Sequence, residues 1–407
     1  MSVDENDPHR SSRAVTSIYI ARALRDFGDG FVAVLLPVYL TSIGLGALEV
    51  GFVSAAALLG STAITLVIAF AGSKVDQRSL LILASGLMVA TGIAYAVSET
   101  YGIILLVALI GTVNPSAGST SIFVPLEHTV LSRSVADGDR TQMFARYSLS
   151  GALAAALGAF AAASPDAVAS LGISQLAAIK GMFVLYALLG IAGGCFYARI
   201  PARPIAADER SAAALGPSRA IVYKMAALFG IDSFAGGLVV QSLLALWLFN
   251  KFDLSVTAAA TFFFWSGVLS AFSFPVAAWL ARRIGLVNTM VFTHIPSSIC
   301  LILAALAPNI EVVLFLLLIR AALSQMDVPT RSSYVMAVVT PAERPAAASV
   351  TSIARSLSSV AGPAITGALF AAGLEIWPLI ACGVLKISYD VALLWVFRDI
   401  KPPEEQG

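Results

Sequence analysis

The sequence predicts an all-α membrane protein with twelve transmembrane helices in two pseudo-symmetric six-helix bundles. Its 407 residues are 58% hydrophobic and only 12% charged, with a mean hydropathy of +0.87, whereas soluble domains are roughly 25% charged. Apolar runs of about 20 residues, the length that a spanning helix needs, fill nearly the whole chain. One long polar stretch near the middle divides these runs into two equal sets.

The apolar runs define the predicted elements in chain order. The spans cover residues 17–42, 48–71, 79–98, 102–127, 140–163, 175–198, 220–249, 255–281, 287–307, 311–335, 343–372 and 376–397. The predicted domains are an N-terminal tail (1–16), a first bundle (17–199), a linker (200–219), a second bundle (220–397) and a C-terminal tail (398–407).

The distribution of Lys and Arg predicts the orientation of the chain. Of the 25 basic residues, 16 fall on the side of the termini, two (Lys180 and Lys251) on the opposite side, and seven within spans. Basic residues are retained on the cytoplasmic side, so we expect both termini in the cytoplasm. The first residues contain no signal-peptide core, so we expect the first span to direct insertion. The expected location is a plasma membrane, such as a bacterial inner membrane.

An internal repeat supports the division into two bundles. At a constant offset of 204 residues, Val124-Pro125 corresponds to Val328-Pro329, Asp139-Arg140 to Glu343-Arg344, and Gly158 to Gly362. Parallel halves of six spans are one of the repeat plans of secondary transporters.

Two loops resemble a family signature. The loop after the second span, Gly72-Ser-Lys-Val-Asp76-Gln-Arg78, resembles the cytoplasmic motif of the major facilitator superfamily, and Leu280-Ala-Arg282-Arg283-Ile-Gly285 resembles its second copy, with Arg282 in place of the usual Asp. The resemblance extends over the whole chain, because the twelve predicted spans also match that superfamily. It implies a monomeric two-bundle transporter that works by alternating access around a midplane cavity. It also implies a latch at Gly72 and Asp76, in which Asp76 caps a neighbouring helix and pairs with Arg78 or Arg133.

The first span carries four charges in its first half: Arg22, Arg25, Asp26 and Asp29. Charges within spans are costly and therefore indicate functional sites. The spacing predicts two i,i+4 pairs, Arg22 with Asp26 and Arg25 with Asp29. The alternative is that Arg22 and Arg25 reach the cytoplasmic headgroups. Asp232 in the seventh span loosely repeats the pattern. Because a desolvated carboxylate has a raised affinity for protons, Asp29, Asp26 and Asp232 are the predicted proton-coupling residues.

Other charges in the second bundle are predicted to line the substrate cavity. Two i,i+4 pairs are predicted, Lys386 with Asp390 and Asp327 with Arg331. Each pair is equally suited to stabilising the fold and to taking part in transport.

Arg320 and Arg355 lie deep within their spans and have no acid three or four residues away. They are therefore predicted either to bind an anionic group or to pair with Asp26, Asp29 or Asp232.

The fourth span contains a predicted break. Gly111, Asn114 and Pro115 interrupt it near its middle, and discontinuous helices are tolerated where their backbone lines a cavity. Asn114 is therefore a further cavity residue. Glu127 corresponds to Arg331 at the repeat offset. The two opposite charges are therefore predicted either to form a gate between the bundles or to act as two separate charges.

Before the eleventh span, Thr340-Pro341-Ala-Glu343 predicts a helix start with Thr340 as N-cap and Glu343 at N3.

The predicted function is secondary active transport of a small solute, coupled to protons and directed outwards, as in drug or metabolite exporters. The alternative is an uptake permease or facilitator for a small organic anion that uses Arg320, Arg355 and Lys386. A membrane enzyme or sensor is the third possibility, but no catalytic cluster supports it, so we expect no enzymatic activity. The expected partners are the solute, protons and the lipid bilayer. No cofactor, metal or nucleic acid is expected.

Overall fold

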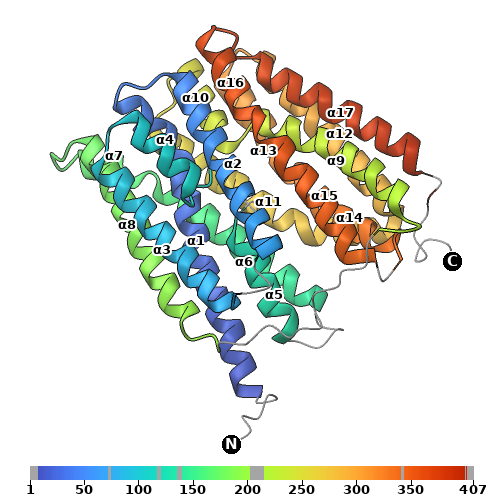
Figure 1. Cartoon of the computed structure of the whole chain (residues 1–407). Helices are drawn as coiled ribbons and strands as arrows, with labels where there is room; N and C mark the ends of the chain where they lie inside the picture. The colour runs from blue at the N-terminus through green and yellow to red at the C-terminus, as the bar shows by residue number, and fades with distance from the viewer. Residues whose placement is uncertain are drawn as a thin grey trace, which may run out of the picture. The chain divides into compact units, whose positions relative to one another are not determined.

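The computed structural model describes residues 8–71, 75–116, 121–134, 140–201, 215–340, 343–398 and 400. Within these residues all regular structure is helical (Figure 1), which confirms the predicted all-α fold. The chain divides into two compact units. The N-unit comprises Met1–Gly44, Ala56–Ala207 and Val256–Phe264, and the C-unit comprises Leu45–Ala55, Asp208–Ser255 and Trp265–Gly407.

The first half of the chain contains eight helices in the described residues. They are α1 (Pro8–Ser42), α2 (Ala47–Ala71), α3 (Gln77–Val97), α4 (Tyr101–Ile110), α5 (Phe123–Ser134), α6 (Arg140–Ala161), α7 (Ser164–Ala169) and α8 (Gln175–Tyr197). The fourth predicted span is divided into α4 and α5, with residues 111–116 outside any helix. The predicted break is thereby confirmed.

The second half contains nine helices in its described residues. They are α9 (Arg219–Leu238), α10 (Gln241–Phe252), α11 (Val256–Ile284), α12 (Leu286–Leu306), α13 (Ile310–Ser324), α14 (Asp327–Ala337), α15 (Arg344–Ser359), α16 (Ala361–Ala371) and α17 (Trp377–Phe397). Each of the seventh, tenth and eleventh predicted spans is formed by two consecutive helices. The breaks inside these three spans were not predicted from the sequence. Gly236-Gly237, Pro329 and Gly362-Pro363 lie close to these breaks, and Gly and Pro are the residues that weaken helices.

The two units use the same helix pairings. In the N-unit, α1 packs against α6 and α8, and α3 packs against α8; in the C-unit, α9 packs against α15 and α17, and α12 packs against α17. Counted in predicted spans, these are pairs 1–5, 1–6 and 3–6, and then 7–11, 7–12 and 9–12. The second set is the first shifted by six spans, as expected for a structural repeat.

Glycines allow the central helices of each unit to approach closely. A Cβ atom on Gly158 in α6 would lie 1.9 Å from the carbonyl oxygen of Phe27 in α1, and one on Gly362 in α16 would lie 2.2 Å from the carbonyl carbon of Gly237 in α9. Gly158 and Gly362 correspond at the repeat offset, so the same close contact occurs in both units. Small residues at such positions are typical of helix packing in membranes.

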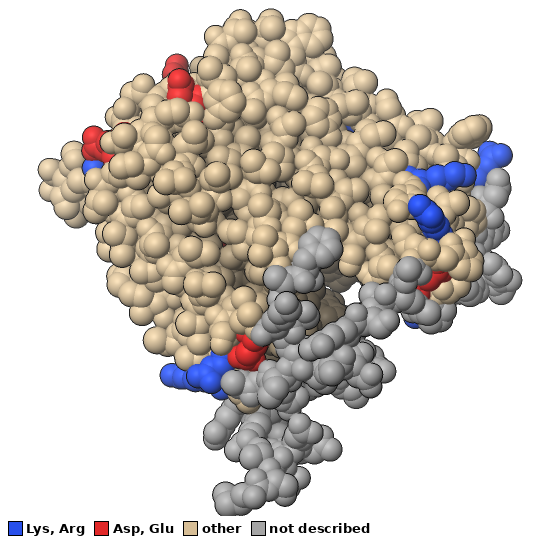
Figure 2. All heavy atoms as spheres, viewed as in Figure 1, with Lys and Arg blue, Asp and Glu red and all other residues tan. Residues whose placement is uncertain are grey.

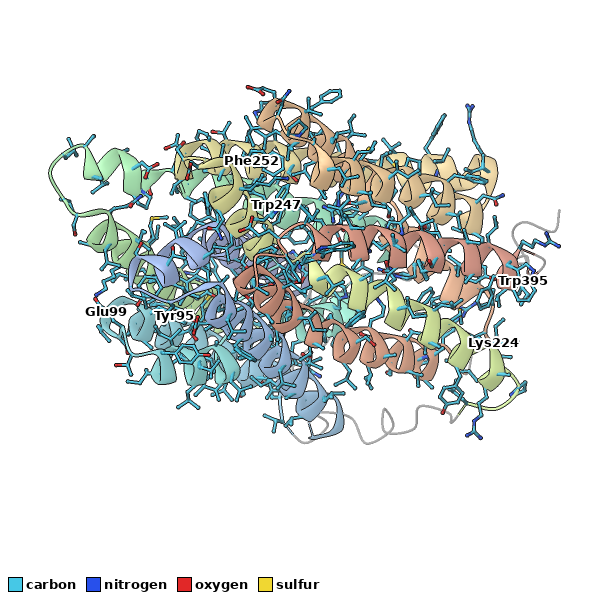
Figure 3. The ribbon with its side chains drawn as sticks, turned by 90° about the horizontal axis from the view of Figure 1, so that it is seen from above. Tyr95, Glu99, Lys224, Trp247, Phe252 and Trp395 are labelled. Carbon is cyan, nitrogen blue, oxygen red and sulfur yellow. The ribbon has the colours of Figure 1, made fainter. Side chains whose placement is uncertain are left out.

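The surface agrees with a chain that spans a membrane. Nine helical segments in the described residues are long and apolar enough to cross a bilayer, and α1 falls outside this set because of its internal charges. On the face shown in Figure 2, charged side chains occur in a few small groups on a broad uncharged surface. Figure 3 shows Lys224 on α9 and Trp395 on α17 pointing outwards; the exposed fraction of Trp395 is 76%. The chain is a multi-pass membrane protein.

Candidate functional site

Three of the four charges that α1 carries within the first predicted span are neutralised within the N-unit. The Asp26 carboxylate lies 3.1 Å from Nε of Arg22 and accepts hydrogen bonds of 3.0 and 3.2 Å from Nη2 and Nε of Arg25. Arg22 stacks on the Tyr147 ring, with its guanidinium carbon 3.7 Å from the ring centroid. The predicted Arg22–Asp26 pair is therefore present. The headgroup alternative for Arg22 is wrong, because Tyr147 and Asp26 hold the side chain in the protein, 6% exposed.

Glu127 in α5 provides the second partner of Arg25. Nη1 of Arg25 donates to Oε1 of Glu127 at 3.1 Å, and the Tyr147 and Tyr197 hydroxyls donate to the two carboxylate oxygens. Glu127 is fully buried, so these donors replace the water that a carboxylate would otherwise need. Because Arg25 is occupied by Asp26 and Glu127, the predicted Arg25–Asp29 pair does not form.

Asp29 differs from the other acids of the spans. It is 2% exposed, and no basic side chain among the described residues lies within ion-pair distance of it. Its neutral contacts are the Tyr186 hydroxyl, which donates to Oδ1 at 3.2 Å, and the Asn114 side chain. The single Tyr186 proton is shared with the carbonyl oxygen of Thr112 at 3.1 Å, so Asp29 receives only part of one hydrogen bond from it.

The break between α4 and α5 places polar groups beside Asp29. Asn114 is 3% exposed, and its Oδ1 accepts from the backbone N–H of Ser116 at 3.0 Å, which fixes the turn. Thr112 and Tyr186 bring their hydroxyl oxygens to 3.1 Å from each other. The predicted cavity residue Asn114 and the predicted proton site Asp29 thus lie together.

In the C-unit, Asp232 in α9 is the centre of a second charge cluster. Its Oδ1 accepts from Nζ of Lys386 in α17 at 2.6 Å, and its Oδ2 accepts from Nη1 of Arg331 in α14 at 3.3 Å. Nη1 of Arg331 also donates to Asp327 at 2.6 Å, so the predicted Asp327–Arg331 pair is present. All four side chains lie inside spans, and each is matched by an opposite charge.

His294 in α12 extends this cluster, and sequence reasoning missed it. Its Nδ1 lies 3.1 Å from both carboxylate oxygens of Asp390 in α17, and its Nε2 lies 3.3 Å from Nζ of Lys386. Lys386 has only donors, so Nε2 accepts from it and Nδ1 carries the proton that is donated to Asp390. The predicted Lys386–Asp390 pair is therefore wrong: Lys386 binds Asp232, and His294 separates it from Asp390. In the sequence His294 is a single histidine in an apolar run, and its partners belong to other helices.

The two clusters join equivalent spans with inverted charges. In the N-unit a base on the first span, Arg25, binds an acid on the second part of the fourth span, Glu127. In the C-unit an acid on the seventh span, Asp232, binds a base on the second part of the tenth span, Arg331. The partners of Glu127 and Arg331 described here lie within their own units.

Arg320 and Arg355 are half-buried, and neither forms an ion pair with an acid of the described residues. Nε of Arg355 in α15 donates to the Ser233 hydroxyl at 3.1 Å. For Arg320 in α13, the backbone carbonyl accepts from Ser297 at 3.4 Å. Within the described residues of the C-unit, the predicted pairing of either arginine with Asp232 is not observed.

The predicted latch lies partly outside the described residues. Gly72 falls outside them, as does the side chain of Arg133. Asp76 caps α3, the helix that it directly precedes, by accepting from the backbone N–H of Ser79 at 3.3 Å. Arg78 is half-buried in the first turn of α3.

The start of the eleventh span also differs from the prediction. Helix α15 begins at Arg344, and Glu343 occupies its N-cap position because the Glu343 carboxylate binds the segment before α9. It accepts from the hydroxyls of Ser218 and Thr340, both at 2.6 Å, and from the backbone N–H of Gly216. The hydroxyl of Ser218 first, and then that of Thr340, lower the pKa of Glu343 to about 2. Glu343 thereby ties the starts of α9 and α15 together.

Comparisons with known proteins agree with this architecture. The sequence model of the major facilitator superfamily matches residues 225–407. The membrane protein YJR124C of Saccharomyces cerevisiae is 21% identical over 427 residues, which cover 96% of this chain and 95% of that protein.

Solved structures match over nearly the whole chain. A bacterial homologue of the human lysosomal transporter Spinster is similar with a TM-score of 0.73 and 14% identity, covering 97% of this chain and 98% of that one. The nucleoside transporter NupG gives 0.70 and 16% over 95% and 99%, and the human organic anion transporter MFSD10 gives 0.63 and 16% over 94% and 99%. At these identities the likeness shows the fold. The chain therefore has the fold of major facilitator superfamily transporters, and the sequence model of that superfamily matches its second half.

Proposed function

We propose that the chain is a proton-coupled secondary active transporter of a small solute and that it works by alternating access. The observation that carries this proposal is the environment of Asp29. Asp26, Glu127, Asp232, Asp327 and Asp390, the other buried acids inside the described transmembrane helices, each contact Arg or His, whereas Asp29 has neutral partners from Tyr186 and Asn114. Burying an uncompensated charge is expensive, and binding a proton removes that charge.

Proton binding at Asp29 provides the coupling. When Asp29 is charged, its environment favours states in which water or a solute reaches it. When Asp29 is protonated, it becomes a neutral donor and acceptor that suits a closed, dehydrated environment. A group that favours different states with and without its proton links the proton gradient to the conformational cycle. Asp26 and Asp232 are held by cations, and we assign them structural roles.

Export in exchange for protons is the direction that we propose first, with both termini in the cytoplasm of a plasma membrane. Uptake of a small organic anion is the second candidate, and the half-buried Arg320 and Arg355, which lack an acid, favour it. The two candidates differ in the sign of proton movement. Exchange moves protons against the solute, and cotransport moves them with it.

The test uses full-length protein in liposomes that contain a pH-sensitive dye. Uridine, glutarate and ethidium serve as probes of a nucleoside, an organic anion and a lipophilic cation. We expect at least one probe to move protons with wild type and none to do so with Asp29→Asn. The exposed Asp253→Asn is the control and should behave as wild type. Proton movement by Asp29→Asn at the wild-type rate would contradict the assignment.

A further inference from the structure

We propose that Arg355 in α15 is a binding site for a carboxylate or phosphate group, carried by the transported solute. The site lies wholly within the C-unit. The proposal rests on the transport function proposed above and adds the chemical class of the substrate. Three features carry it: the absence of an acid partner for Arg355 in the described residues, the fixed orientation of its guanidinium, and the sign of the surrounding charge.

The acids of the C-unit spans are already occupied. Asp232 binds Lys386 and Arg331, Asp327 binds Arg331, and Asp390 binds His294. Arg355 forms no ion pair with any of them. An arginine is always protonated, and half-burial removes part of its water, so the site retains a positive charge that an anion would compensate.

The contact with Ser233 prepares Arg355 for such an anion. Its Nε donates to the Ser233 hydroxyl at 3.1 Å, which uses one of its five N–H groups and fixes the plane of the guanidinium. The two terminal nitrogens have no hydrogen-bond acceptor among the described residues. This pair of parallel donors matches the two oxygens of a carboxylate or phosphate. Because the side chain is half-buried, an incoming anion can reach it and still displace water from it.

The surroundings add positive charge. Away from the first five and last four residues of each predicted span, the C-unit spans contain four cations (Arg320, Arg331, Arg355 and Lys386) against three acids (Asp232, Asp327 and Asp390). The difference, four minus three, leaves one positive charge for a bound anion to balance. The hydrogen bond that His294 donates to Asp390 adds no charge to this count.

The other two basic candidates fit an anion site less well. Lys386 is held by Asp232 at 2.6 Å and contacts His294, so it has to break a buried ion pair before it can bind a ligand. The guanidinium of Arg320 lacks a side-chain hydrogen bond among the described residues that would fix its orientation. Arg355 combines an unpaired charge with a fixed orientation.

The experiment measures equilibrium binding to the full-length protein in phosphatidylcholine nanodiscs, through the shift of the thermal unfolding midpoint with ligand concentration. Benzoate, glutarate and glucose 6-phosphate are compared with their uncharged counterparts benzamide, glutaramide and glucose. We expect at least one anion to raise the midpoint more than its counterpart. Arg355→Gln should weaken that binding about tenfold or more, as expected for the loss of charge-assisted hydrogen bonds.

Further variants separate this role from a structural one. Arg355→Lys keeps the charge without the paired donors and should give an intermediate affinity. The exposed Arg282→Gln is the control and should bind as wild type. If no anion exceeds its uncharged counterpart, if Arg355→Gln binds as wild type, or if Arg320→Gln alone abolishes binding, the proposal is overturned.

A second arm identifies the source of the anion. Nanodiscs with phosphatidylglycerol test whether a lipid headgroup occupies the site. Stabilisation by this lipid that disappears in Arg355→Gln, without an effect of the soluble anions, assigns the site to a lipid and overturns the solute. Proton coupling is tested in the liposome assay with Asp29→Asn, and anion binding is tested in the nanodisc assay with Arg355→Gln. Failure of proton coupling and failure of anion binding are thus observed separately.

Discussion

Asp26 and Asp29 lie three residues apart on α1, yet their environments are opposite. Asp26 accepts from Arg25 and lies 3.1 Å from Nε of Arg22, whereas Asp29 has neutral partners among the described residues. Removing one member of a buried ion pair leaves its partner uncompensated, at a cost of about 3–5 kcal/mol. Removing an unpaired charge has no such cost. Similar substitutions at the two positions should therefore have different effects on stability.

Asp26→Asn should lower the midpoint of thermal unfolding clearly, and Asp29→Asn should leave it unchanged or raise it. Both variants keep the size of the side chain, so the comparison isolates the charge. The measurement is the unfolding midpoint of the purified variants at neutral pH. Equal destabilisation by both variants would show that Asp29 is paired like Asp26.

Gly151 in α6 lies directly beside the Arg22–Asp26 pair. A Cβ atom there would lie 2.2 Å from Nε of Arg22 and 2.3 Å from Oδ2 of Asp26. Gly151→Ala should therefore displace the pair and lower the free energy of unfolding by about 1–3 kcal/mol. Gly181→Ala in α8 is the matched control, because a Cβ atom there meets nothing within 4 Å. The prediction fails if the two variants unfold at the same temperature.

Residue spacing predicted charge pairs only where no better partner is available on another helix. Arg22–Asp26 and Asp327–Arg331 form as predicted. Arg25–Asp29 and Lys386–Asp390 do not, because Arg25 reaches Glu127 and Lys386 reaches Asp232 on other helices. The tyrosines around Glu127 and the position of His294 depend in the same way on helix packing, which a single sequence does not contain.

At the scale of the elements, the sequence predicted the spans well and their interruptions poorly. All twelve predicted spans coincide with one helix or two consecutive helices. The break at Gly111, Asn114 and Pro115 was predicted because several polar and helix-breaking residues occur together. Other breaks follow single glycines or prolines in apolar runs, where tertiary packing decides whether the helix continues.

The tie between α9 and α15 through Glu343 predicts a pH-dependent contribution to stability. The pKa of Glu343 is lowered from 4.5 to about 2 in the folded protein. A lowered folded-state pKa stabilises the fold above the unfolded-state pKa, and this contribution is lost as the pH falls through the folded-state pKa.

Glu343→Gln should therefore lower the unfolding midpoint at pH 7. The difference from wild type should shrink as the pH decreases from 4.5 towards 2. Glu311→Gln, at the exposed start of α13, serves as the control. A difference that is constant with pH would show that the carboxylate charge of Glu343 is not what joins the two helices.

At the scale of the whole molecule, the two units repeat one arrangement of helices but differ in charge. In the described spans of the N-unit, Arg22 and Arg25 are paired and one acid, Asp29, is left over. In the described spans of the C-unit the acids are matched, and Arg320 and Arg355 are left over. The fold follows from span number and repeat, which composition and spacing reveal. Substrate and direction do not follow, because one fold serves many solutes.

The most direct test of proton coupling at Asp29 compares two activities of Asp29→Asn in the same liposomes. One is exchange of labelled probe between equal concentrations, which needs alternating access alone. The other is accumulation of that probe driven by a pH gradient, which also needs proton coupling. We predict that Asp29→Asn retains exchange and loses accumulation, whereas Asp253→Asn retains both. Accumulation at the wild-type level by Asp29→Asn would contradict the account.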